Sequence, residues 1–170
     1  VRIDAHHHVW HLSRGDYGWL TRALAPIHRD FSFADLEIWL DQARIDATVL
    51  VQGAPTVAET EFLLAVAAAS QGIVQGVVGW VDLAAPAAIA TLEHLVCNRS
   101  LRGVRPMLQD IADPHWILRP DVTAALSALP ALGLRFDALV TPRELPALLR
   151  MLDRLPELTV VVDHAAKPPI

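Results

Sequence analysis

The sequence predicts an α/β fold in which six parallel β-strands alternate with helices. Short runs rich in Val, Ile and Leu recur along the chain with little polar alternation, as in parallel strands covered by helices. Longer stretches between these runs carry the residues that begin and end helices. No linker rich in Pro, Gly or Ser divides the 170 residues, so we expect one domain over residues 1–170.

Six segments have the composition of strands. They are Val1–His8, Ala47–Gln52, Ile73–Val81, Leu101–Pro106, Leu134–Val140 and Thr159–His164. Each pair of consecutive strands is separated by enough chain for a crossover helix. Strand–helix alternation of this kind predicts right-handed βαβ units and a parallel sheet.

The helices are predicted from their ends. Thr56-Val-Ala-Glu59 is a capping box, in which the Thr56 hydroxyl accepts from the Glu59 amide and the Glu59 carboxylate reaches back to the backbone. Gly72 is a suitable end for that helix. Thr141-Pro-Arg-Glu144 repeats the pattern with proline at the first helical position. Three more helices are expected along the apolar stripe of Phe33, Leu36, Leu40 and Ala43, near Ala87–Val96, and over Asp121–Leu132.

Composition excludes several classes of protein. The net charge is −5, and the 14 Lys and Arg residues form no run, which disfavours a nucleic-acid surface or a polybasic membrane patch. No apolar stretch approaches the roughly 20 residues that span a bilayer. Cys97 is the only cysteine, so no internal disulfide is possible. We expect a cytoplasmic protein that acts on a small molecule without nucleic acid or membrane as partners.

The strand order leaves two architectures open. Both an open doubly wound sheet and a (β/α)8 barrel of TIM type, truncated after the sixth strand, fit six alternating units. No GxGxxG loop follows any strand, so the nucleotide-binding form of the open sheet loses its main support. The long connection from Val9 to Ser32 is a candidate functional loop because structureless stretches of that length are uncommon.

The densest polar cluster lies at the first strand, Asp4-Ala-His6-His7-His8. Residues two apart on a strand share a face, so Asp4, His6 and His8 point one way and His7 the other. Two imidazoles at the carboxyl end of a strand can bind a metal or donate to a carbonyl oxygen. A surface patch of histidines is the alternative, which the surrounding strand pattern disfavours.

Other polar side chains follow later strands. Asp163 and His164 end the sixth strand after a run of valines, and His164 is either catalytic or a solvated loop residue. Arg105 either holds a carboxylate or carbonyl of the substrate or forms a salt bridge with a loop acid such as Asp110. Trp80 is a sugar-stacking or a core residue. The remaining candidates for pocket lining are Gln52 and Asp82.

These residues carry a resemblance to a known family. The matching stretches are Asp4–Trp10 (DAHHHVW), Gly15–Leu20 (GDYGWL), Val49–Glu61 (VLVQGAPTVAETE), Val77–Leu83 (VVGWVDL), Leu101–Ile111 (LRGVRPMLQDI) and Val161–Pro168 (VVDHAAKP). In this order they resemble the amidohydrolase-2 branch of the amidohydrolase superfamily, and within it the sugar lactonases of the L-fuconolactonase and L-rhamnono-lactonase kind. The resemblance covers the whole chain.

The resemblance implies a (β/α)8 barrel and the hydrolysis of a sugar lactone in carbohydrate metabolism. His6, His8 and His164 match the catalytic histidines, which would also hold one divalent metal such as zinc if the enzyme is not metal-independent. Arg105, Gln52, Trp80 and Asp82 would bind the substrate. Relatives carry the general base on an eighth strand, so residues 1–170 are expected to be an N-terminal fragment that is inactive alone. Homo-oligomers are possible in this family.

Two alternatives remain open. The first is another enzyme of the amidohydrolase-2 branch, such as a metal-dependent decarboxylase or hydrolase. The second is a non-catalytic ligand-binding α/β domain, in which the histidines only line a pocket.

Overall fold

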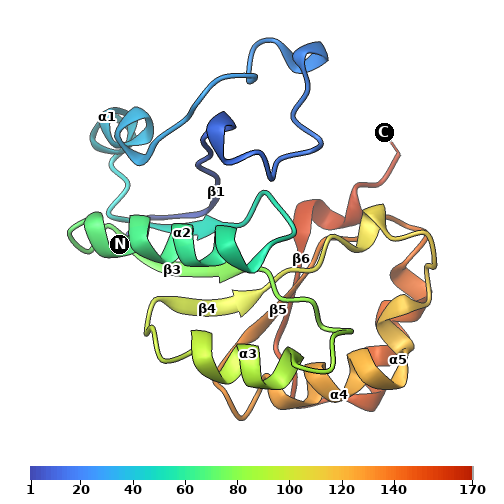
Figure 1. Ribbon diagram of the computed structural model, residues 1–170. Helices are drawn as coiled ribbons and strands as arrows, with labels where there is room; N and C mark the ends of the chain where they lie inside the picture. Colours follow the sequence, from blue (N-terminus) through green and yellow to red (C-terminus); the bar gives the residue numbers. More distant parts are fainter. Residues whose placement is uncertain (170) are drawn as a thin grey trace. The chain divides into compact units, whose positions relative to one another are not determined.

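The computed structural model describes residues 1–169. Strands and helices alternate along the chain as predicted, from β1 to β6 with five α-helices between them (Figure 1). The chain divides into two compact units, the first covering Val1–Trp80 and the second beginning at Val81. Each unit contains three parallel strands, and within each unit the strand order follows the chain order.

The first unit is built on three paired strands. They are β1 (Ile3–His7), β2 (Ala47–Val51) and β3 (Val74–Gly79). Ile3 lies opposite Ala47, and the register shifts between Asp4 and His7. The pairing of β2 with β3 joins Leu50 to Val77. The helices of this unit are α1 (Phe33–Ala43) and α2 (Val57–Ala69), of which α2 packs on β2 and β3.

One half of the predicted Thr56 capping box is present. The Thr56 hydroxyl accepts from the Glu59 amide at 3.0 Å. The Glu59 carboxylate does not return to the helix start and instead accepts from the N–H groups of Gly53 and Ala54. The prediction was wrong on this point because the turn after β2 brings buried N–H groups closer to the carboxylate than the Thr56 amide, which bonds to Ala54.

The second unit has the same construction. Its strands are β4 (Leu101–Val104), β5 (Arg135–Ala138) and β6 (Val160–Val162), and its helices are α3 (Ala88–Leu95), α4 (Pro120–Ala128) and α5 (Leu145–Arg154). Gly103 lies opposite Arg135, and Asp137 lies opposite Val161. Helix α4 stops before the predicted end at Leu132 because Pro130 cannot continue it. Helix α5 begins at Leu145, after the Thr141–Glu144 turn.

All six strands stop short of their predicted carboxyl ends. The sixth shows the cause best, since it ends at Val162 and passes into a 3-10 segment, η5 (Asp163–Ala166). Within that segment His164 takes the left-handed conformation, with φ of 51°. A left-handed residue leaves the strand ladder, so the polar residues predicted as strand tips lie on the turns that follow.

The connection between β1 and α1 is ordered by its own contacts. It contains two short 3-10 helices, η1 (Leu12–Arg14) and η2 (Arg22–Leu24). A backbone bridge joins Trp10 to Phe31 near its two ends. The loop therefore forms a closed structure of its own over the end of β2, where Tyr17 and Leu20 pack with Ala54.

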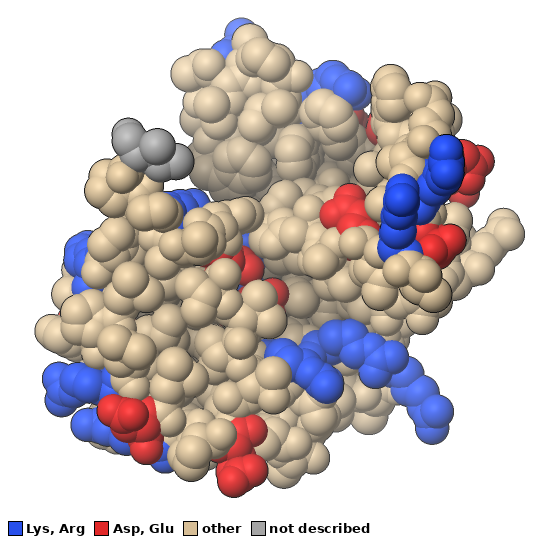
Figure 2. Space-filling view, turned by 180° about the vertical axis from the view of Figure 1, so that it is seen from behind, with Lys and Arg blue, Asp and Glu red and all other residues tan. Residues whose placement is uncertain are grey.

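The surface carries charge of both signs. Figure 2 shows Lys and Arg side chains, some of them adjoining one another, together with Asp and Glu on the face it presents. Among the described residues, no helix is both long and apolar enough to cross a membrane. Cys97 is exposed.

Candidate functional site

The side chains of His6 and His8 converge at the carboxyl end of β1. Their Nε2 atoms lie 3.3 Å apart, and their rings meet edge to face at 5.0 Å. His8 Nδ1 lies 2.7 Å from the Val51 carbonyl oxygen at the end of β2. A carbonyl oxygen only accepts hydrogen bonds, so His8 carries its proton on Nδ1 and, when neutral, offers the Nε2 lone pair.

His7 lies on the opposite side of β1, as strand alternation predicts. It is buried, with Nε2 at 2.9 Å from the Thr48 hydroxyl and its ring near Phe33 of α1. Burial lowers the pKa of His7 to about 4, against an opposing effect of Asp4. Its imidazole is therefore neutral at physiological pH and packs as part of the core.

Gln52 and Trp80 follow β2 and β3 directly. The Gln52 side chain is fully buried, and its backbone N–H donates to Val78. Trp80 is half-buried, and its N–H and carbonyl both bond to the Thr60 hydroxyl of α2, at 2.7 and 2.9 Å. These two hydrogen bonds between α2 and the end of β3 fix the backbone at Trp80.

Arg105 forms a buried ion pair in the second unit. Its guanidinium donates to Asp163 at 3.0 Å, and the two side chains are 4% and 2% exposed. Arg105 thus forms a salt bridge, as one of the two predicted roles required, and the acid that the structure gives it is Asp163, which directly follows a strand of the same sheet. The ion pair fixes the orientation of the guanidinium.

Asp137 of β5 lies in the same charged cluster. Its pKa is raised to about 7, chiefly by burial and also by the charge of Asp163, while the charge of Arg105 opposes both effects. A carboxyl group with this pKa can hold or release a proton near neutrality. Three adjacent strands of the second unit thus bring Arg105, Asp137 and Asp163 together at their carboxyl ends.

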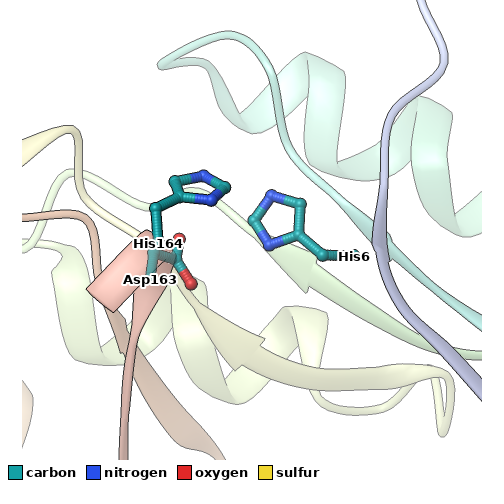
Figure 3. Close-up of side chains that lie close together, drawn as sticks. All are labelled: His6, Asp163 and His164. Atoms are coloured by element: carbon teal, nitrogen blue, oxygen red, sulfur yellow. The ribbon is translucent and has the colours of Figure 1, made fainter. Parts of the chain in front are cut away.

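His164 and Asp82 are the exposed members of the predicted set. Asp82 lies on the turn before α3, where its carboxylate accepts from the Ala84 amide at 3.1 Å. His164 follows Asp163 on the η5 turn, so the two neighbouring side chains differ sharply in burial. Figure 3 shows His6 leaving β1, and Asp163 and His164 leaving the end of β6.

Several of these groups have the chemistry of metal ligands. His6, Asp163 and His164 each offer a nitrogen or oxygen atom of the kind that zinc binds. His8 donates through Nδ1 to a backbone carbonyl, which is the arrangement that orients a metal-binding imidazole through its other nitrogen. Each of these side chains is therefore of a type that fits a divalent metal such as zinc.

Two further polar residues were not predicted as functional. Glu59 of α2 is fully buried, with its carboxylate at the turn that follows β2. Burial raises the pKa of both Glu59 and the neighbouring Tyr17. The sequence does contain a signal for Asp137, because it is the one acidic residue in the predicted strand Leu134–Val140. Glu59 gave no comparable signal because its place in a capping box already explained it.

The chain matches a family model described as "Amidohydrolase" over residues 3–170. It is 48% identical to an L-fucono-1,5-lactonase of Burkholderia ambifaria over 169 residues, which are 99% of this chain and 58% of that protein. An L-fucono-1,5-lactonase of Burkholderia multivorans is 32% identical over 99% of this chain and 56% of its own length. The chain thus spans little more than half the length of these relatives.

Solved structures share the fold. A crystal structure of an amidohydrolase from Burkholderia multivorans with bound zinc matches 98% of this chain and 58% of its own, with a TM-score of 0.88 and 32% identity. A probable 2-pyrone-4,6-dicarboxylic acid hydrolase from Acinetobacter baumannii matches with a TM-score of 0.78 at 22% identity, which supports the fold alone. These matches confirm the predicted class, an α/β fold of (β/α)8-barrel type of which this chain carries six strands.

Proposed function

We propose that this chain, which belongs to the amidohydrolase family, is part of an enzyme that hydrolyses a sugar lactone. The observation that carries the proposal is the convergence of His6 and His8, whose Nε2 atoms lie 3.3 Å apart at the end of β1. The similarity to two L-fucono-1,5-lactonases supports the lactone as substrate class. Their greater length supports a second proposal, that residues 1–170 are the first six β/α units of a longer barrel.

The reaction adds water to the lactone carbonyl and breaks the ring C–O bond, which leaves a hydroxy acid. We assign His6, His8 and His164 to the site of the carbonyl oxygen. The N–H groups of His6 and His164 would stabilise the negative charge that develops as water attacks. His8, which offers a lone pair at Nε2, would act as a metal ligand. His6 is suited to donate through Nε2, because its neighbour His8 holds its own proton on Nδ1 against Val51.

A divalent metal, if bound, would supply Lewis-acid polarisation of the same carbonyl. We propose His6, His8 and His164 as its ligands, with Asp163 as a further donor. The Nδ1 hydrogen bond of His8 supports this role, since it directs the Nε2 lone pair away from the backbone.

We assign the orientation of the substrate to residues that follow other strands. We assign Arg105 to a hydroxyl or carbonyl oxygen of the lactone, because the ion pair with Asp163 fixes the guanidinium in one orientation. Gln52, Trp80 and Asp82 complete the proposed pocket. Attack by water needs a general base, which the family resemblance assigns to a later strand.

The test is a lactonase assay of the full-length protein with matched histidine variants. L-Fucono- and L-rhamnono-lactones are hydrolysed under a pH indicator, with and without chelator, and metal content is measured in parallel. We expect His6→Asn and His164→Asn to lower kcat/KM by about 100-fold or more, because each removes a group that stabilises the transition state. His94→Asn, on an exposed position of α3, is the control and should change kcat/KM by less than two-fold.

Other outcomes point to the rival functions. Turnover of aromatic acids but not lactones, lost on chelation, would favour a decarboxylase. Binding of sugar lactones without turnover of any of these compounds would favour a ligand-binding domain. Either result would overturn the proposed function.

A further inference from the structure

Resting on the proposed lactonase function, we infer that Trp19 is the face on which the sugar ring of the lactone stacks, and that it selects sugar lactones over unsubstituted ones. Trp19 lies on the loop between β1 and α1, the same loop that follows the His6–His8 pair. Aromatic rings offer a flat apolar surface to ligands, and an indole offers the largest one. Nothing in the proposed reaction yet uses this side chain.

The Trp19 indole is linked to the surroundings of the histidine pair through the backbone that follows β2. The Gln52 N–H donates to the Val78 carbonyl at 2.8 Å, toward β3. The Val51 carbonyl belongs to the same trans peptide group as this N–H and therefore points the opposite way, toward β1. The Val51 carbonyl is the one that holds the ring of His8.

The Gly53 carbonyl, two residues further along the chain, holds Trp19. The Trp19 indole Nε1–H donates to this oxygen at 2.6 Å. Two residues of chain span at most about 7 Å between their Cα atoms, so the anchors of His8 and Trp19 are close together. This closeness suits a lactone whose carbonyl lies at the histidine pair and whose ring extends over the indole.

The indole is rigid and yet accessible. Trp10 meets it edge to face at 5.7 Å, and Tyr17, two residues away, is buried against Ala54. Despite these anchors Trp19 remains 40% exposed. A tryptophan that served only to pack the loop would bury its face, whereas a fixed, exposed face is what a stacking surface needs because little side-chain entropy is lost on binding.

The experiment compares two substrates in the full-length protein. The variants are Trp19→Leu, which keeps apolar bulk against Trp10, and Trp19→Phe, which keeps a smaller ring without the N–H donor. Trp39→Leu is the control, since Trp39 is 59% exposed on α1. The substrates are L-fucono-1,5-lactone and δ-valerolactone, which has the same ring size and no hydroxyl groups.

We expect Trp19→Leu to raise KM for the sugar lactone about ten-fold, equal to roughly 1.4 kcal/mol, while kcat changes less than two-fold. KM for δ-valerolactone should change less than two-fold, and Trp19→Phe should fall between the wild type and Trp19→Leu. The control should leave both substrates unchanged. Equal effects of Trp19→Leu on the two substrates, or no effect, would overturn the inference while leaving the lactonase proposal standing.

A separate measurement distinguishes failure of the function itself. If the wild-type protein hydrolyses neither lactone, the lactonase proposal fails, and binding of L-fucose is measured by calorimetry. Binding that weakens about ten-fold in Trp19→Leu then supports stacking on Trp19. Binding that is unchanged in the variant, or no binding by the wild type, overturns it.

Discussion

Glu59 illustrates how one buried side chain can shape the end of a strand. Its carboxylate accepts from the Gly53 amide at 3.0 Å and the Ala54 amide at 2.7 Å. Tyr17 of the loop between β1 and α1 lies against the same carboxylate, and both groups have a raised pKa. Glu59 thereby links the loop that carries Trp19 to the turn that follows Gln52.

We predict that Glu59→Ala lowers the free energy of unfolding by about 3 kcal/mol, because two buried N–H groups lose their acceptor. Glu59→Gln should recover most of this loss, since one amide oxygen can accept from both groups. Urea unfolding monitored by circular dichroism measures the change. Glu61→Ala, on the exposed side of the same helix, is the control and should cost less than about 0.5 kcal/mol.

The same residue makes a pH prediction. Burial raises the pKa of Glu59 above its ordinary value of 4.5, so the folded protein holds this proton more tightly than the unfolded chain does. Its contribution to stability is therefore fully present below about pH 4.5 and is lost as the pH rises through the folded pKa. The stability of the wild type relative to Glu59→Gln should fall with rising pH. A constant difference from pH 4 to 8 would contradict this assignment.

The ion pair of Arg105 with Asp163 gives a third prediction. Removal of one partner leaves the other charge buried, so Asp163→Ala should lower the free energy of unfolding by about 3 kcal/mol. Replacing both by apolar residues, Arg105→Met with Asp163→Leu, should regain most of that loss. Asp153→Ala, exposed on α5, serves as control in the same urea titration. A double variant no more stable than Asp163→Ala would show that the pair is not the source of the effect.

At the scale of elements, two glycines let neighbours approach closely. A Cβ at Gly79 would lie 2.4 Å from the Thr60 methyl group, so β3 can lie directly under α2 only with glycine there. A Cβ at Gly103 would lie 2.8 Å from the carbonyl oxygen of Arg135, the residue opposite it on β5. Backbone atoms cannot move aside as the end of a side chain can, so a Cβ is tolerated less well at Gly103 than at Gly79.

We therefore predict that Gly103→Ala forces β4 away from β5 and lowers the free energy of unfolding by about 2 kcal/mol. Gly18→Ala is the matched control, because a Cβ at Gly18 meets no atom within 4 Å. Thermal melts of both variants against the wild type decide the matter. Equal melting temperatures for the two variants would mean that the β4–β5 register differs from the one described.

Periodicity and end signals were enough to predict all six strands and five helices, because those signals are local. The predicted strands extend beyond the observed ones, because the apolar composition continues past the last hydrogen bond between the strands, as at Val81 after β3. The His6–His8 pair was predictable from alternation along one strand. The Arg105–Asp163 pair joins residues 58 apart in the chain, and local patterns do not report such pairing. The role of Glu59 was missed for a different reason, because its place in a capping box already explained why an acid stands there.

At the scale of the whole molecule, the first and last strands keep apolar side chains exposed. Ile3 of β1 is 54% exposed, and Val161 and Val162 of β6 are 47% and 42% exposed. On α1, Ile38 and Trp39 are exposed by 62% and 59%. Soluble proteins rarely leave such groups uncovered on edge strands, because an unpaired apolar edge recruits other chains.

These exposures lead to the prediction that a polypeptide of residues 1–170 is poorly soluble and has no lactonase activity, in contrast to a full-length protein. The family resemblance assigns water activation to a later strand, and loss of a general base normally costs about 10²–10⁴-fold in rate. An eight-stranded barrel also needs all its strands to close and cover the edges of β1 and β6.

The comparison requires the two polypeptides to be expressed side by side and their soluble fractions measured by gel filtration. Acid release from L-fucono- and L-rhamnono-lactones is then followed at equal protein concentration. Adding a separately expressed C-terminal part should restore activity if it covers the exposed strands and supplies the base. Turnover by residues 1–170 at the rate of the full-length protein would show that the histidines, Arg105 and the carboxyl groups of this chain suffice. The base would then be sought within it, first at Asp137, whose pKa of about 7 suits that role.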